Sequence, residues 1–295
     1  MNQVIRVENV STAINGKVLL DSINIHLEES NRVAIFGEAG SGKTLIYKIL
    51  STVLHPSSGK VLFFDKDIFH YPRLKERIGY ISQEYVHYSY FTVKGLLSFY
   101  NSFYKKANTH IRDAYLDFFK IRLNDSITIL NKRQQLGLTI IAALMHEPRI
   151  VIIDHFSHGL DETTRLNLLK LIKDDIGKLH ASLLLLTPDI IELEELVTSV
   201  AMLIEGKIAF LKGFSDYRLK YKKVKIFADK ELDFEDISIT NIKKVEREGK
   251  IYSLVIDGNL NYITELLSLE GFQILDVKDY TLREFLTDKK EGKIL

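Results

Sequence analysis

The eight residues from Gly37 to Thr44, GEAGSGKT, constrain the fold of this chain more than any other stretch. They match the pattern G-x-x-x-x-G-K-[ST]. The apolar run Arg32–Phe36 before them is typical of a buried strand, and Leu45–Leu50 after them has helical spacing. In such a strand–loop–helix unit the backbone N–H groups turn inward around phosphate oxygens, at the positive end of the helix. The sequence therefore predicts a phosphate-binding loop in an α/β protein.

The predicted ligand is ATP with Mg²⁺. We expect Lys43 to reach the β- and γ-phosphates and Thr44 to offer its hydroxyl to Mg²⁺. A second apolar run, Val151–Ile153, ends at Asp154, and a carboxylate at the end of a buried strand is a common Mg²⁺ ligand near phosphates. The predicted ATP-binding residues are Gly37, Glu38, Ala39, Gly40, Ser41, Gly42, Lys43 and Thr44.

Length and composition narrow the class of protein. The 295 residues suffice for one large domain and one small domain. A net charge of +1 gives no overall field that would attract nucleic acid, so no nucleic-acid partner is expected. No apolar run reaches the roughly 18–20 residues that span a bilayer, and the start alternates like a strand rather than a signal peptide. The absence of cysteine excludes disulfides and thiolate metal sites. The lack of a predicted membrane span or signal peptide favours a soluble cytoplasmic protein, whereas the absence of cysteine does not by itself fix the compartment.

Further motifs follow the phosphate loop in a fixed order. They are HPSSGKVLFFDKDI, RIGYISQEY, LNKRQQLGLTIIAALMHEPRIVIID, HFSHGLD and SLLLLTPDIIELEELVTSVAMLIEGKIAFLKG. With the loop, they resemble the ATP-binding cassette family, the ATPase subunits of ABC transporters, over residues 1–220. The resemblance implies the P-loop NTPase fold of ABC ATPases: a mixed sheet core, an antiparallel edge sheet and a helical subdomain. Residues 221–295 then form a small C-terminal α/β extension.

The resemblance also assigns site residues. Gln83 corresponds to the glutamine that contacts Mg²⁺ and the attacking water, and Asp161 to the aspartate of the D-loop. The signature segment, which faces the nucleotide of a second cassette, corresponds to Asn131, Lys132, Arg133 and Gln134. In this family two cassettes dimerise head to tail, so each ATP lies between the phosphate loop of one chain and the signature of the other.

Several positions depart from the family pattern. His155 stands where the family has its catalytic glutamate, and Pro188 stands at the switch histidine that contacts the γ-phosphate. The signature serine and two glycines are Asn131, Lys132 and Arg133. No aromatic residue occurs in residues 1–35 to stack on adenine, and Ile14 or a neighbour takes its place. Since the phosphate and metal groups are kept, we expect ATP binding with weak or absent hydrolysis.

Some of these changes admit two interpretations. Either residue 155 has changed by drift at a position that is no longer under selection, or the neutral imidazole of His155 accepts a proton from water. Lys132 and Arg133 either contact the γ-phosphate of the partner's nucleotide or hold the dimer open by their bulk. Asn131 can cap the following helix as serine would. His158 is expected to be a surface residue of the D-loop.

An aromatic segment follows Gln83. Residues 84–104 contain eight aromatic residues in 21 positions. In ABC transporters this region receives a short coupling helix from the membrane subunit, and an aromatic groove suits an apolar helix. Tyr85, Tyr88 and Tyr90 are the candidates for such a groove, whereas Phe99 and Phe103 are candidates for the subdomain's own core.

The basic stretch RLKYKK, residues 218–223, is predicted to lead into the extension. Thr281 and Glu284 fit a helix capping box at its end. The extension resembles that of bacterial drug and peptide exporter ATPases, which implies a dimer contact or a regulatory lid, although a role in closing the fold is equally open. Strands are predicted at 224–228, 242–245, 251–256 and 272–277, with a helix at 260–269.

Taken together, the sequence predicts the ATP-binding subunit of a bacterial ABC exporter for a peptide or drug-like substrate. Its expected place is the cytoplasmic face of the membrane, against a multi-span membrane subunit. A second, more intact ABC ATPase chain is expected beside it in a heterodimer, with a homodimer as the alternative. A nucleotide-sensing regulator that does not power transport is the second candidate. A soluble ABC ATPase of translation or DNA repair is the third, but the chain has a single cassette and no long coiled-coil insertion.

Overall fold

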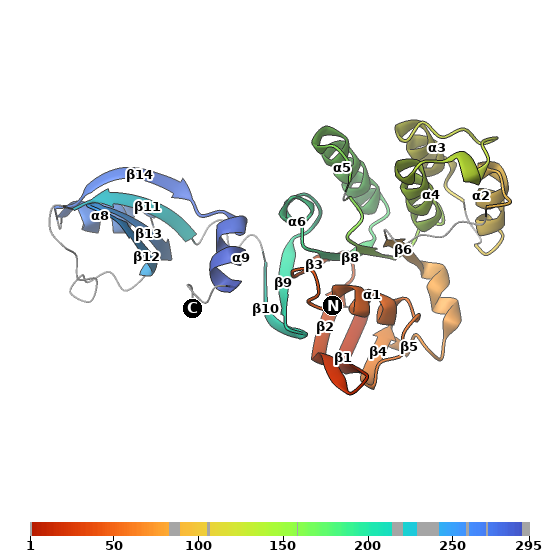
Figure 1. Ribbon diagram of the computed structural model, residues 1–295, viewed down its shortest axis with the longest axis horizontal. Coiled ribbons are helices and arrows are strands. Elements are labelled where there is room, and N and C mark those ends of the chain that lie inside the picture. Colours follow the sequence, from red (N-terminus) through yellow and green to blue (C-terminus); the bar gives the residue numbers. More distant parts are fainter. Residues whose placement is uncertain are drawn as a thin grey trace. The chain divides into compact units, whose positions relative to one another are not determined.

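The computed structural model describes residues 2–82, 89–104, 107–157, 159–213, 221–228, 242–257, 260–269 and 271–290 (Figure 1). The chain divides into two compact units, Met1–Leu211 and Lys212–Leu295, which are described separately. The sequence interpretation placed the boundary after residue 220, and the roles assigned to the two parts stay a prediction.

The first unit holds two sheets, in the orders β2-β1-β4-β5 and β10-β9-β3-β8-β7-β6. Its strands are β1 Gln3–Ile14, β2 Lys17–Glu28, β3 Arg32–Phe36, β4 Ser58–Phe63, β5 Lys66–Asp67, β6 Ile78–Ser82, β7 Ile150–Asp154, β8 Ser182–Thr187, β9 Ser199–Ile204 and β10 Lys207–Gly213. Its α-helices are α1 Lys43–Leu50, α2 Val93–Asn101, α3 Thr109–Phe118, α4 Lys132–Leu144, α5 Glu162–Lys178 and α6 Ile190–Leu196. Two 3₁₀ turns, η1 Pro72–Arg77 and η2 Ile127–Ile129, complete the described elements.

The larger sheet sets the position of the candidate site. Strands β6, β7, β8, β3 and β9 pair in parallel, and their continuous apolar runs are buried on both faces, as expected for a parallel sheet covered by helices. The register pairs Phe36 with Thr187, and Asp154 with Leu186. The carboxyl ends of β3, β7 and β8 therefore meet at one edge, where an open α/β sheet binds its ligands.

Helix α1 fills the space between the two sheets. Its residues Ile46, Ile49 and Leu50 belong to one apolar core with side chains from the antiparallel sheet and from β3, β7 and β8. Figure 1 shows the helix between β1 and the parallel strands. Because α1 begins at Lys43, directly after the glycine-rich loop, this packing fixes the loop against the sheet.

The turn before β10 lies against β2. Asp21 N donates a hydrogen bond of 2.9 Å to the carbonyl oxygen of Gly206, and the Lys207 ammonium lies 3.1 Å from the Asp21 carboxylate. A Cβ on Gly206, whose φ is +76°, would come within 2.3 Å of the Leu19 carbonyl oxygen. Only glycine allows this approach without a shift of the backbone.

Helices α2, α3 and α4 form the helical part of the unit (Figure 1). At Gly137 the helices α3 and α4 come close, because a Cβ there would lie 2.5 Å from the Phe119 ring. The described aromatic residues of this part do not all enter its core. Tyr90 and Phe103 are 77% and 58% exposed, so the interpretation of Phe103 as a core residue is wrong. Tyr85 and Tyr88 lie outside the described residues.

The second unit is a four-stranded antiparallel sheet in the order β12-β13-β11-β14. Its strands are β11 Tyr221–Phe227, β12 Ile242–Glu248, β13 Ile251–Asp257 and β14 Gln273–Asp279, and its described helices are α8 Leu260–Leu269 and α9 Leu282–Lys290. These elements agree with the sequence prediction to within three residues at each end. The strand order is that of a split β-α-β arrangement, and Leu267 of α8 joins the core formed by alternate residues of β11 and β13.

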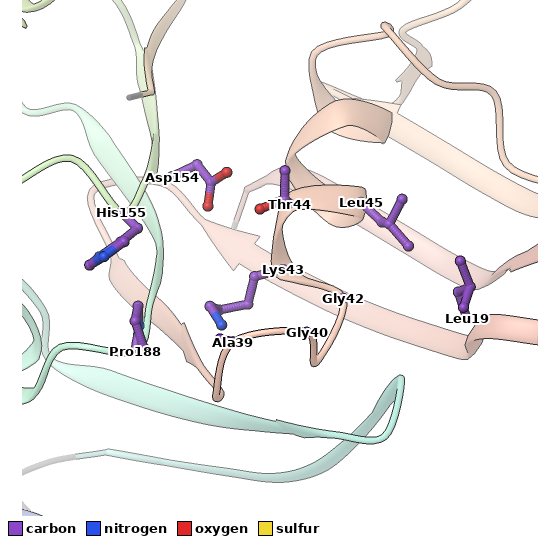
Figure 2. A pocket seen from close by; sticks show the side chains of 10 residues that line it. All are labelled: Leu19, Ala39, Gly40, Gly42, Lys43, Thr44, Leu45, Asp154, His155 and Pro188. Atoms are coloured by element: carbon purple, nitrogen blue, oxygen red, sulfur yellow. The ribbon is translucent and has the colours of Figure 1, made fainter. Parts of the chain in front are cut away.

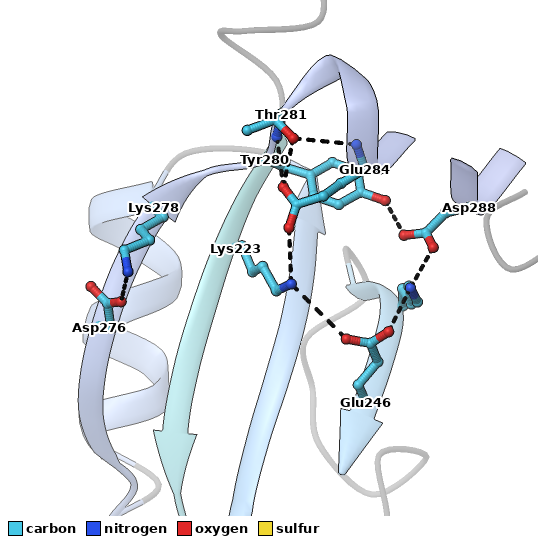
Figure 3. Close-up of polar contacts among 9 residues, drawn as sticks. Lys223, Glu246, Asp276, Lys278, Tyr280, Thr281, Glu284 and Asp288 are labelled. Carbon is cyan, nitrogen blue, oxygen red and sulfur yellow. Dashed lines mark hydrogen bonds and ion pairs between the residues drawn. The ribbon is translucent and has the colours of Figure 1, made fainter. Parts of the chain in front are cut away.

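Helix α9 is tied to this sheet by polar contacts (Figure 3). Asp288 is buried, accepts a hydrogen bond from the Tyr280 hydroxyl and pairs with Lys244 at 2.5 Å. The predicted capping box is confirmed, since Glu284 N donates to Thr281 Oγ1 at 3.2 Å and Thr281 N donates to the Glu284 carboxylate at 3.0 Å. The helix therefore begins where the sequence predicted.

Candidate functional site

A pocket of about 500 Å³ opens at the carboxyl edge of the parallel sheet (Figure 2). The phosphate loop forms one side of it. The ends of β7 and β8 form the other side. Its lining residues are Leu19, Ala39, Gly40, Gly42, Lys43, Thr44, Leu45, Asp154, His155 and Pro188.

The glycines of the loop are required by its geometry. Gly42 has φ +109° and stands directly before α1, and a Cβ there would meet the Leu20 side chain at 2.7 Å. A Cβ on Gly37 would lie 2.5 Å from Ser41 Oγ and 2.8 Å from the Leu203 carbonyl oxygen. These conformations and close approaches are accessible to glycine alone, and they bring the loop backbone into a tight turn at the N-terminus of α1.

Lys43 is the buried cation of the loop. Its Nζ donates to the carbonyl oxygens of Gly37 and Glu38, both at 2.7 Å. Burial lowers the pKa of Lys43, while the Asp154 and Glu38 carboxylates act in the opposite direction. The ammonium group is thus held by the loop in the pocket where a polyphosphate would contact the backbone N–H groups.

Thr44 and Asp154 lie on opposite sides of the pocket. Figure 2 shows the Asp154 carboxylate and the Thr44 hydroxyl pointing toward one another. Asp154 is buried, whereas Thr44 is exposed to the pocket. One carboxylate, one hydroxyl and the oxygens of a polyphosphate form the kind of donor set that Mg²⁺ takes, with water in the remaining positions. These residues fit Mg²⁺ bound together with ATP, whereas the third predicted ligand, Gln83, lies outside the described residues.

His155 follows Asp154 and lines the same pocket. Its backbone has φ +34°, and its N–H donates to the Leu186 carbonyl oxygen at 2.9 Å. The imidazole Nδ1 lies 4.0 Å from a carboxylate oxygen of Glu192 in α6. Contact with Glu192 raises the pKa of His155, although burial acts in the opposite direction.

Glu192 was not singled out in the sequence. It is fully buried and accepts hydrogen bonds from the Ser157 backbone N–H at 3.2 Å, from the Ser157 hydroxyl and from the Thr187 hydroxyl. Ser157 and Thr187 border the residues His155 and Pro188 that face the pocket. A glutamate inside a short helix gives no sequence signal for such a role, because only the fold reveals its burial.

The described residues that line the pocket include no phenylalanine, tyrosine or tryptophan. Leu19 on β2 lines the pocket, whereas Ile14 is not among the described lining residues and is 42% exposed. Pro188 supplies a ring without a hydrogen-bond donor. The sequence expectation that Ile14 or a neighbour takes the place of the stacking aromatic stays a prediction.

The signature segment forms the N-terminus of α4. The predicted cap is confirmed, since Gln134 N donates to Asn131 Oδ1 at 3.0 Å and the Gln134 side chain accepts from Asn131 N at 3.2 Å. The Arg133 guanidinium lies 4.0 Å from the Asp161 carboxylate. Asp161 itself caps α5 by accepting from Thr164 N at 2.9 Å. The structure therefore brings the signature cation and the D-loop aspartate together within one chain. His158 lies outside the described residues.

Comparisons with known proteins agree with this architecture. A family model described as "ABC transporter" matches residues 20–157. Solved structures include an ATP-binding subunit of an ABC transporter, with 22% identity and a TM-score of 0.66 over 73% of this chain and 92% of that one. A dimeric ATP-binding cassette bound to ADP and Pi has 20% identity and a TM-score of 0.60, over 71% of this chain and 98% of that one. The first unit has the P-loop ABC ATPase fold.

Curated relatives differ in how much of the chain they match. The ABC transporter ATP-binding protein YtrB of Bacillus subtilis is 21% identical over 86% of both chains. The spermidine/putrescine import ATP-binding protein PotA of Spiroplasma citri is 24% identical over 70% of this chain and 60% of its own. The relatives thus include importers, so the likeness supports an ABC transporter ATP-binding subunit without giving a direction of transport.

Within the part of the chain that the structure describes, no helix is both long enough and apolar enough to cross a membrane.

Proposed function

We propose that this chain is an ATP-binding subunit of an ABC transporter that holds Mg-ATP at a dimer interface, with weak or absent hydrolysis of its own. One observation carries the proposal. The pocket keeps Lys43, Thr44 and Asp154, but its opposite side presents His155 and Pro188. The groups for binding phosphate and metal are in place, and the groups for the chemical step are replaced.

The expected loss of ATP hydrolysis follows from the contribution that the replaced groups make to the rate. A positioned general base contributes about 10²–10⁴-fold to a rate. Neither Pro188 nor the buried Glu192 presents a carboxylate to a water in the pocket, and the imidazole of His155 does not reproduce the reach or charge of a glutamate. We therefore expect ATP turnover to be about 10²–10⁴-fold lower than with a general base in place, while ATP still binds.

The proposed partners are a second ABC ATPase chain and a multi-span membrane subunit. A cassette of the same fold has been solved as a dimer bound to ADP and Pi, which supports a second ATPase chain as a partner. In a homodimer both sites would combine the His155 side with the altered signature, so a heterodimer with a more intact chain leaves one productive site. Such an assembly places this chain at the cytoplasmic face of the membrane, with ATP and Mg²⁺ as its ligands.

Export of a peptide or drug-like substrate is the proposed direction. The importer PotA matches 70% of this chain, whereas YtrB, whose name gives no direction, matches 86%. The alignment with the importer PotA thus leaves a larger part of this chain unmatched than the alignment with YtrB does. The second unit, which resembles the extension of exporter ATPases, is the proposed dimer contact or regulatory part. The altered pocket also suits a nucleotide-sensing regulator that does not power transport, which is the second candidate.

Purification of the affinity-tagged chain from native membranes tests this proposal. We expect a multi-span membrane protein and a second ABC ATPase to co-purify in equal amounts with it, and Mg-ATP to increase the amount recovered. The matched control is Lys43→Ala, which removes the phosphate contact and should abolish the effect of ATP. Recovery of the chain without a membrane protein would favour the regulator. A reconstituted transporter with this chain as its sole ATPase and ordinary turnover would refute the proposed defect.

A further inference from the structure

We propose that His155, positioned by the buried Glu192, donates a hydrogen bond to the γ-phosphate and so distinguishes ATP from ADP in this pocket. This inference rests on the proposed function and deepens it. In the family pattern the γ-phosphate contact comes from position 188, where this chain has proline. Here the contact is assigned to a different strand end, β7 in place of β8.

The first step is the fixed position of Glu192. Its carboxylate is fully buried and accepts hydrogen bonds from the Ser157 backbone, the Ser157 hydroxyl and the Thr187 hydroxyl. These donors come from the segments after β7 and at the end of β8. A carboxylate with this many donors is held in one orientation. Glu192 therefore cannot reach a ligand itself and acts through a neighbour.

The second step is the neighbour on which it acts. The nearest oxygen of Glu192 lies 4.0 Å from His155 Nδ1. An imidazole has two ring nitrogens on different sides, so with one facing Glu192 the other can donate to a second anion. The left-handed backbone of His155, φ +34°, is an uncommon conformation for a non-glycine residue, and such conformations are concentrated at functional sites.

The third step is the identity of the second anion. His155 lines the same pocket as Lys43, Asp154 and Pro188. Figure 2 shows its ring beside Pro188 and turned away from Thr44, Asp154 and Lys43, so contact with a phosphate requires the ring to turn toward the loop. The ring is thus separated from the predicted metal ligands and lies beside the position that lacks a donor. The γ-phosphate is the anion that ATP has and ADP lacks, so a donor at this place acts on ATP selectively.

Calorimetric titration of the full chain with Mg²⁺ and either AMP-PNP or ADP tests the inference. His155→Ala should weaken AMP-PNP binding about tenfold, the size of one charge-assisted hydrogen bond, and change ADP binding less than about twofold. Glu192→Gln should shift the ratio of the two affinities in the same direction by about threefold. Glu194→Gln, an exposed position on the same helix, is the matched control and should change neither affinity.

A double-mutant cycle separates positioning from general damage to the fold. In the His155→Ala background, Glu192→Gln should no longer change the AMP-PNP to ADP ratio. His155→Gln, whose amide can also donate, should restore part of the ratio. If Glu192→Gln keeps its full effect without His155, or if His155→Ala weakens both nucleotides equally, the inference is wrong. Those results leave the proposed function intact, which fails instead if Lys43→Ala leaves both affinities unchanged.

Discussion

The two sides of the candidate nucleotide pocket differ in how their groups are supplied. On the loop side, the proposed binding groups are the backbone, with left-handed conformations at Gly40 and Gly42 and a close approach at Gly37, and one lysine. On the opposite side, the family pattern depends on single side chains at the ends of β7 and β8, and here those are His155 and Pro188. A binding site that is built from the backbone is lost only if the fold changes. A site that depends on single side chains can be lost by one substitution, with almost no effect on the stability of the fold.

The second side of the pocket also has a buried part behind its surface residues. Behind His155 and Pro188, the buried group of Glu192, Ser157 and Thr187 is fully hydrogen-bonded. We therefore expect this group to position residues that are introduced at positions 155 and 188. Three experiments, taken from the largest expected effect to the smallest, test whether the two sides are separable in this way.

Restoring the second side should have the largest effect. We expect His155→Glu combined with Pro188→His to raise ATP turnover about 10²–10⁴-fold, because it supplies a general base and a γ-phosphate contact. Steady-state phosphate release measures this. The matched control, His155→Gln with Pro188→His, lacks the base and should stay near background. Robust hydrolysis by the wild type that disappears in His155→Ala would show that the imidazole itself is the base.

Removing the cation of the loop side should affect binding rather than chemistry. We expect Lys43→Ala to lower the affinity for Mg-ATP about 100-fold, because the phosphates lose a charge-assisted contact in a partly buried site. Calorimetry is the measurement, and Lys48→Ala on the same helix, outside the pocket lining, is the control. An unchanged affinity in Lys43→Ala would falsify the phosphate-loop assignment.

The residues of the pocket also differ in how well the sequence predicted them. Lys43 and Thr44 were predicted from the loop pattern, and Asp154 from its place at the end of a buried apolar strand, a common position for a Mg²⁺ ligand near phosphates. Both arguments need only local sequence patterns. The cap at Asn131 was predictable for the same reason, since it depends on residues three positions apart.

The rest of the site depends on contacts between distant segments. Glu192 lies 37 positions after His155, and neither spacing nor composition indicates that its carboxylate is buried next to the imidazole. Likewise, the ion pair of Arg133 with Asp161 joins the starts of two helices. Such pairs are set by how α4, α5 and α6 pack on the sheet, so they became visible only in the structure.

The signature segment should show the smallest effect. Its helix cap is intact, so we expect Lys132 and Arg133 to contribute a favourable charge toward the partner's nucleotide. Lys132→Gly with Arg133→Gly should weaken ATP-dependent association with the second ATPase several-fold, roughly the size of exposed charge effects, and added salt should weaken the wild-type complex. Analytical ultracentrifugation measures both.

The partner of Arg133 offers a matched control. Asp161→Asn keeps a capping side chain for α5 but removes the negative charge beside Arg133. We expect it to leave association unchanged or to strengthen it. Stronger association in the double glycine variant would instead show that the two long side chains hold the dimer open.

The turn at Gly206 has a mechanical consequence. Strand β10 begins right after this turn and runs to the point where the first unit ends, and the turn is fastened to β2 through Asp21, two residues from the pocket residue Leu19. A force pulling on the chain beyond residue 211 first loads the pairing of β10 with its neighbour β9, and only then the Asp21–Gly206 hydrogen bond and the Asp21–Lys207 pair at the start of β10. Tension that separates β10 from β9 would thus reach β2, the strand that carries the pocket residue Leu19, through Asp21.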